Sequence, residues 1–163
     1  MGGAIADMWT KSVIQVTSGS GGGVSNIVNA GRGEADLGLS TTSMLGAAAK
    51  GLDPFKEPVE GTALFANIYR QYTYFIMRKD YADKNGVKSV KDIVAKKLPI
   101  RFATLKPGTS SEFAIRSIFE KGFGVKWDDI KSWGGSVSFA SYSDGADLLA
   151  DNHLDCFAFQ VSR

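Results

Sequence analysis

The sequence predicts an α/β protein with largely parallel sheets flanked by helices, on the basis of three observations. Short β-branched or apolar runs alternate with segments of helical periodicity along the 163 residues. Two strand-to-helix connections, residues 17–23 and 106–112, are both built from small and hydroxyl-bearing residues. They fall in different halves of the chain, which favours two lobes that face each other across a cleft. We expect a first lobe with a crossing strand at residues 1–78 and a second lobe at residues 79–163.

The first half begins with helical spacing, because apolar side chains at residues 4–9 share one face. Residues 13–17 are rich in β-branched side chains and predict a strand that leads into the glycine loop. A helix with Val24 and Val28 on its apolar face follows and ends near Gly31. Residues 35–39 predict another strand, residues 44–50 a helix, and the two prolines within residues 51–61 a loop.

The second half opens with two β-rich stretches, residues 63–69 and 72–77, which we interpret as the crossing between lobes. Ser89 with Asp92, and Thr109 with Glu112, have the spacing of capping boxes and predict two helix starts. In that pattern Glu112 turns back to the cap. Further strands are expected at residues 99–105, 137–140 and 155–159, and a helix at 146–150 with Ser143 as its cap.

Composition excludes several classes of function. The net charge is +2 and basic residues form no dense patch, which argues against a nucleic-acid-binding surface. Cys156 and His153 are the sole cysteine and histidine, so the chain has no internal disulfide and no metal site of the usual His and Cys spacing. We also expect no membrane insertion, since no apolar run is long enough to span a bilayer, and the chain start lacks the features of a signal peptide.

The two loops favour capture of a small anion without catalysis. The first turn of a helix presents unsatisfied N–H groups and partial positive charge, and hydroxyl groups beside it add donors. The loop at residues 106–112 brings Ser110 and Ser111 to such a start. Residues 40–42 carry three more hydroxyls at the end of a predicted strand, where ligands gather in open α/β sheets. Simple helix capping and flexible turns are the alternatives at these places.

An enzyme that binds a nucleotide or phosphate is the alternative function. The glycine loop contains Gly19-x-Gly21, as a dinucleotide-binding fingerprint does, but Val24 stands where the third glycine belongs. No Gly-Lys-Ser/Thr follows, so the loop is not a P-loop. His153 and Cys156 lie near each other in sequence without a third orienting group, so we predict no catalytic residues.

Five segments resemble the TAXI family, the solute receptors of TRAP transporters. Residues 2–9 resemble the opening helix of that family, and residues 28–40 resemble its NAGEADLGL segment with an Arg32-Gly33 insertion. Residues 107–112 are similar to its PGSGTE loop, with Ser111 in place of the second glycine. Residues 141–146 are similar to its YSEAAD helix start, and residues 155–159 to its DAAFF strand. The matches occur in order over nearly the whole chain.

The resemblance implies a type II periplasmic-binding-protein fold, in which two lobes close on a small carboxylate such as glutamate without a cofactor. It implies an extracytoplasmic location and docking of the loaded receptor on the membrane subunits of a TRAP transporter. Which basic residue neutralises the ligand, for instance Arg70 or Arg78, stays open. By position, the resemblance assigns the ligand contacts to Ser18, Gly19, Ser20, Ser40, Thr41, Thr42, Tyr69, Thr109, Ser110, Ser111 and Gln160.

The sequence departs from the family at both ends. The family has a strand and a glycine loop before Gly2, and further elements after Arg163 that complete its first lobe. We therefore expect a truncated chain with an incomplete first lobe, in which exposed sheet edges could drive dimerisation. A third reading follows from this expectation, namely a folded remnant that binds nothing.

Overall fold

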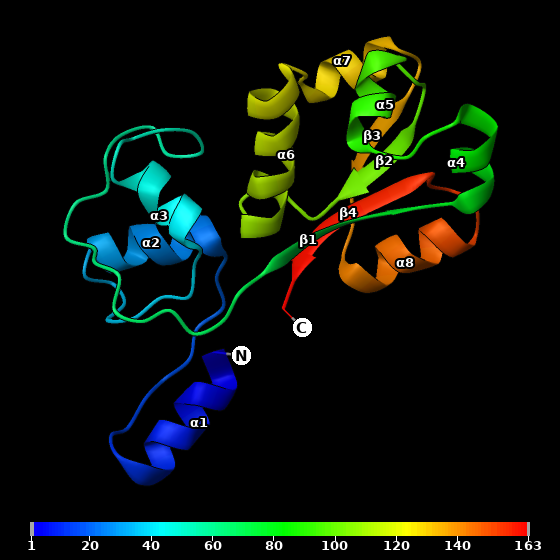
Figure 1. Ribbon diagram of the computed structural model, residues 1–163. Coiled ribbons are helices and arrows are strands. Elements are labelled where there is room, and N and C mark those ends of the chain that lie inside the picture. Colours follow the sequence, from blue (N-terminus) through cyan, green and yellow to red (C-terminus); the bar gives the residue numbers. More distant parts are fainter. Residues whose placement is uncertain (1, 163) are drawn as a thin grey trace. The chain divides into compact units, whose positions relative to one another are not determined.

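The computed structural model describes residues 2–162, and the chain divides into two compact units, Met1–Leu64 and Phe65–Arg163 (Figure 1). The second unit contains a four-stranded sheet of β1 (Tyr72–Met77), β2 (Arg101–Thr104), β3 (Ser136–Phe139) and β4 (Cys156–Val161), in the order β1-β4-β2-β3. β2 pairs in parallel with both β3 and β4, and β1 pairs antiparallel with β4. The predicted α/β class with a mostly parallel sheet is confirmed.

Helices cover both faces of this sheet because side chains on each strand alternate between the faces. Phe102 belongs to the core cluster that contains side chains of α5 (Val90–Ala95), α6 (Ser110–Phe123) and α7 (Trp127–Ser132). The next residue along β2, Ala103, belongs to the opposite cluster, into which α8 (Tyr142–Ala150) packs. α4 (Lys79–Asn85) follows β1 directly. The rings of Phe102 and Phe119 lie 5.4 Å apart and anchor the larger cluster.

The first unit consists of α1 (Gly2–Ser12), α2 (Gly23–Gly31) and α3 (Thr42–Ala48) joined by long loops. The predicted strands at residues 13–17, 35–39 and 63–69 are wrong, because the structure assigns no strand to these residues. A strand requires a hydrogen-bonded neighbour, and these segments have none. Their apolar side chains are correspondingly open to solvent: Val13 is 80% exposed, Leu37 54% and Phe65 79%.

The other predicted elements form close to their expected positions. The strand expected at residues 99–105 forms as β2, and α6 ends at Gly124, which adopts a left-handed φ of 68°. The predicted cap at Ser143 is wrong, because α8 begins earlier and Ser141 accepts the hydrogen bond from the Asp144 N–H. β1, which we had counted with the first lobe as the crossing strand, pairs with β4 in the sheet of the second unit.

Candidate functional site

Two helices begin at the carboxyl edge of the sheet in the second unit. β2 leads through residues 105–109 into α6, and β3 leads through Ala140 and Ser141 into α8. Since β2, β3 and β4 are parallel, these connections leave the sheet at one edge. β1 runs the other way, so its first residues lie at the same edge, with Thr73 opposite Gln160.

Thr109 caps α6 as the sequence predicts. Its Oγ1 accepts a hydrogen bond from the Glu112 N–H at 3.2 Å and donates one to the carbonyl of Lys106 at 2.7 Å. Glu112 does not turn back to the cap, because its carboxylate accepts from Arg116 Nε at 2.9 Å and from Trp127 Nε1 at 3.4 Å. This buried carboxylate therefore ties the first turn of α6 to α7 and is held away from the carboxyl edge.

Gln160 forms hydrogen bonds with residues of three neighbouring elements. Its N–H donates to Ser111 Oγ at 2.7 Å, and its carbonyl accepts from the Tyr142 hydroxyl at 2.8 Å. Its side-chain Nε2 donates to Thr73 Oγ1 at 3.1 Å. These bonds join β4 to α6, α8 and β1, so the structure brings Ser111 and Gln160, two predicted ligand contacts, together.

Tyr69 lies in the segment that precedes β1 and carries no secondary structure. The pKa of Tyr142 is raised above its ordinary value of 10.0, first by burial and second by the charge of Tyr69. Two of the predicted contacts, Ser111 and Gln160, are thus joined by a hydrogen bond, and Gln160 is bonded in turn by Tyr142 and Thr73. Sequence reasoning missed both of these last two residues, since each bonds partners far away in the chain.

In the first unit, the structure also brings the two predicted segments together. Ser40 Oγ donates to the carbonyl of Gly23 at 3.0 Å, and Asn26 Nδ2 donates to the carbonyl of Leu39 at 2.7 Å. Residues 38–42 are thereby held against the start of α2, next to the exposed loop of Ser18, Gly19 and Ser20. The approach is close, because a Cβ at Gly38 would lie 2.9 Å from the carbonyl oxygen of Asn26.

Among the hydroxyl groups of residues 40–42 in the first unit, one caps a helix. Thr41 Oγ1 accepts from the Met44 N–H at 3.4 Å and lies 3.2 Å from Ser43 Oγ, so it caps α3. α2 begins without a hydrogen bond from a side chain at its cap, Gly22. The starts of the two helices therefore differ: the Thr41 side chain caps α3, whereas at α2 the Gly22 N–H donates to Ser25 Oγ at 2.8 Å.

Arg70 and Arg78 are the two arginines named above for neutralising the charge of a ligand. Arg78 lies at the end of β1 that is opposite the carboxyl edge of the sheet. It follows Met77, which pairs with Cys156 at the beginning of β4, and its guanidinium forms an ion pair with Asp80. Arg70 precedes β1 and so stands in sequence at the carboxyl edge, as does Lys106 after β2. Among residues 2–162, Arg70 and Lys106 are thus basic residues that stand in sequence beside this edge.

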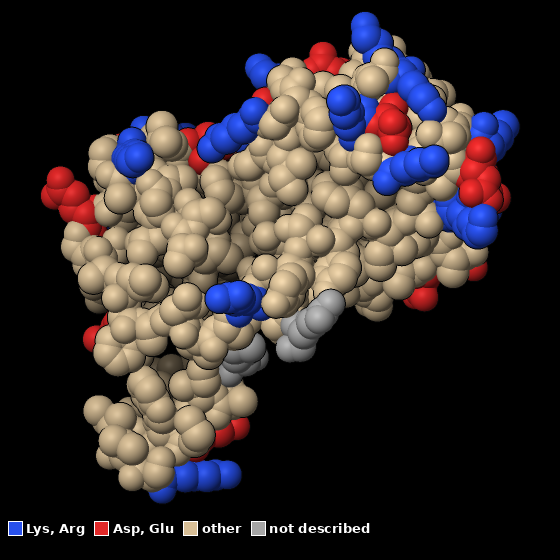
Figure 2. Space-filling model, in the orientation of Figure 1, with Lys and Arg blue, Asp and Glu red and all other residues tan. Residues whose placement is uncertain are grey.

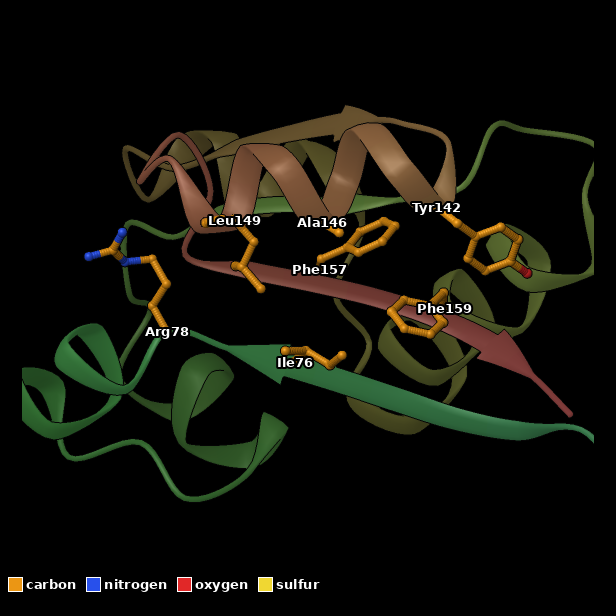
Figure 3. Close-up of a pocket in the computed structure, with 8 residues that line it drawn as sticks. Ile76, Arg78, Tyr142, Ala146, Leu149, Phe157 and Phe159 are labelled. Atoms are coloured by element: carbon orange, nitrogen blue, oxygen red, sulfur yellow. The ribbon is translucent and has the colours of Figure 1, made fainter. Parts of the chain in front are cut away.

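A cavity of about 480 Å³ opens on the α8 face of the same sheet (Figure 3). Its walls are mainly apolar and come from α8, β4 and β1, with Arg78 at one end. None of the eleven predicted contacts lines it.

Elsewhere, the face of the second unit seen in Figure 2 carries interspersed acidic and basic side chains. Within residues 2–162, no group of three His, Cys, Asp or Glu residues could hold a metal ion, and no helix is long and apolar enough to cross a membrane.

The second unit is a mostly parallel sheet whose carboxyl edge joins helix starts that bear hydroxyl groups, and this edge is where ligands bind in open α/β sheets. The sequence profile of the NMT1-like family matches residues 1–162, and the chain belongs to that family. Proteins of this family are of the periplasmic solute-binding type, so the chain is placed among extracytoplasmic receptors. No curated protein matches the chain.

Proposed function

We propose that this protein is an extracytoplasmic receptor that captures a small carboxylate, either a glutamate-like amino acid or an organic acid, between two lobes. The observation that carries the proposal is the hydrogen bond that joins Gln160 of β4 to Ser111 at the carboxyl edge, beside the start of α6. A carboxylate accepts hydrogen bonds from hydroxyl and N–H groups, and the partial positive charge at the start of a helix favours an anion.

The proposed contacts come from both units. The first unit would supply Ser18, Gly19 and Ser20 beside α2 and the three hydroxyls of residues 40–42, and the second unit the contacts from Tyr69 onward. Closure over the ligand would exclude water and so strengthen each charged hydrogen bond. Recognition through N–H and hydroxyl groups needs no metal or cofactor, and the family is of the receptor type.

The resemblance to the TAXI family supports the further proposal that the loaded receptor delivers its solute to the membrane subunits of a TRAP-type transporter. Membership of the NMT1-like family supports a transport partner in general terms. The TAXI assignment and the identity of the transporter remain proposals.

Calorimetric titration with glutamate, glutamine, succinate and ATP tests the proposed ligand class. We expect one carboxylate to bind, and Kd to rise at least tenfold in the double variant Ser110→Ala/Ser111→Ala, a loss of about 1.4 kcal/mol or more. Ser117→Ala, two turns further along α6, is the matched control and should bind as the original chain does. An unchanged Kd in the double variant would remove the start of α6 from the site. Binding of ATP alone would favour the nucleotide alternative instead.

A further inference from the structure

Tyr142 and Ser111 both form a hydrogen bond with the backbone of Gln160. The Tyr142 hydroxyl donates to the Gln160 carbonyl at 2.8 Å, and the Gln160 N–H donates to Ser111 Oγ at 2.7 Å. Tyr142 is the first residue of α8 and Ser111 the second residue of α6. The backbone of Gln160 therefore links the starts of the two helices that leave the carboxyl edge.

The Tyr142 side chain is well suited to a fixed position. Its ring packs edge-on against Phe159, with the ring centroids 5.5 Å apart and the ring planes at 85° (Figure 3). Because burial raises the pKa of Tyr142 above 10.0, the phenol stays protonated near neutral pH and remains a hydrogen-bond donor. The Tyr142 hydroxyl can therefore donate to Gln160 near neutral pH, where a carboxylate is ionised.

Ser111 has little freedom of its own. It is 5% exposed, and its Oγ is already the acceptor for the Gln160 N–H. The direction in which its hydroxyl can point therefore depends on the position of the Gln160 backbone. A shift at the end of β4 would consequently move the donors at the start of α6 away from a bound carboxylate, and such misplacement weakens binding.

We propose that Tyr142 is a positioning residue of the carboxylate site, and that its hydroxyl acts through the Gln160 backbone to hold Ser111 and the first turn of α6 in place. The inference rests on the proposed function, since it concerns the same site. Tyr142 itself need not touch the ligand. Its contribution is geometric, and it should vanish when Ser111 can no longer accept the bond from Gln160.

The structure provides a matched pair of variants. Tyr142→Phe removes the hydroxyl that donates to Gln160 and leaves the ring on Phe159. Tyr74→Phe removes a hydroxyl from another ring that packs against Phe159, at 6.1 Å, and that hydroxyl makes no hydrogen bond within residues 2–162. The two changes are chemically identical, so a difference between them reports the hydrogen bond to Gln160.

Titration with glutamate, glutamine and succinate, well below the unfolding temperature, measures the effect. We expect Tyr142→Phe to raise Kd by up to about fivefold, because the net free energy of one ordinary hydrogen bond is the upper bound on this positioning effect, and Tyr74→Phe to leave Kd unchanged. In a Ser111→Ala background, Tyr142→Phe should have no further effect, whereas a general loss of stability would add to it. Amide NMR shifts at Ser111 and Gln160 should change in Tyr142→Phe only, which tests the linkage without a ligand.

The outcomes separate this proposal from the proposed function. If the unaltered chain binds a carboxylate and Tyr142→Phe binds it equally well, the positioning role is wrong and the function stands. Additive effects of Tyr142→Phe and Ser111→Ala would also overturn the linkage. If the unaltered chain binds none of the three compounds, the carboxylate function fails and the positioning role falls with it, whatever the NMR shifts show.

Discussion

Gly145 provides the sharpest test of how α8 is seated on the sheet. It lies in the second turn of α8, directly over the ring of Phe157. A Cβ at this position would lie 2.4 Å from Phe157 Cζ and 2.5 Å from Cε1, well inside van der Waals contact. Phe157 is 2% exposed and packs against Ala103 and Leu105, so Gly145→Ala must displace either the ring or the helix.

Two opposing contributions determine the change in the free energy of unfolding in Gly145→Ala. Alanine is favoured over glycine within a helix by about 1 kcal/mol, and insertion of a methyl group into a packed core costs about 1–3 kcal/mol. Gly122 in α6 isolates the first term, because a Cβ there would meet no atom within 4 Å. We expect Gly122→Ala to be neutral or stabilising and Gly145→Ala to be less stable than Gly122→Ala by about 1–3 kcal/mol.

Urea unfolding followed by circular dichroism measures both variants, and amide exchange at Phe157 reports the local effect. Since α8 carries Tyr142 at its start, the same displacement should also weaken carboxylate binding in Gly145→Ala but not in Gly122→Ala. Equal stability of the two variants would show that the ring of Phe157 moves into the neighbouring cavity without cost. The close seating of α8 would then have no energetic meaning.

Three further predictions concern the charged and titratable groups of the second unit. The buried Asp155 carboxylate accepts two hydrogen bonds from the Arg101 guanidinium, at 2.5 and 3.0 Å, so Asp155→Asn should lower the free energy of unfolding by about 2 kcal/mol in urea titrations at pH 7. Hydrogen bonds, first from the Lys88 N–H, lower the pKa of Asp92 below 3.8. The contribution of Asp92 to stability is therefore complete above about pH 4 and lost on acidification. Asp92→Asn should accordingly reduce the fall in the free energy of unfolding below about pH 4, as measured by urea unfolding at a series of pH values. Cys156 is fully buried and burial raises its pKa to about 12, so the folded chain should react with a thiol reagent at pH 8 much more slowly than the unfolded chain, as measured by absorbance.

The parts of the fold that the sequence predicted well are those with local signals. The cap at Thr109 depends on residues three positions apart, and the glycine that ends α6 depends on a single backbone conformation. The strands of the second unit were also recognised, because each is a short apolar run bounded by turn residues. The Ser143 cap failed by a small margin, since Ser141 satisfies the same spacing rule two residues earlier.

The errors in the first unit have a common physical cause. Residues 13–17 and 35–39 have the composition of strands, but composition does not supply the neighbouring strand with which a ladder forms. The hydrogen bonds made by Gln160 were likewise beyond sequence reasoning, because its partners Thr73 and Ser111 lie 87 and 49 residues away in the chain. The side-chain contacts of Glu112 depended on Trp127, which lies on another helix.

The two units differ in how firmly each holds the residues proposed as ligand contacts. In the second unit, a sheet and the Gln160 hydrogen bonds fix the donors before any ligand arrives, so little ordering is required there on binding. In the first unit, Ser18, Gly19 and Ser20 are exposed, and the neighbouring segment is held by single hydrogen bonds from Ser40 and Asn26. Ordering that loop must cost conformational entropy. It follows that the proposed contacts of the second unit are preorganised, whereas those of the first unit are not.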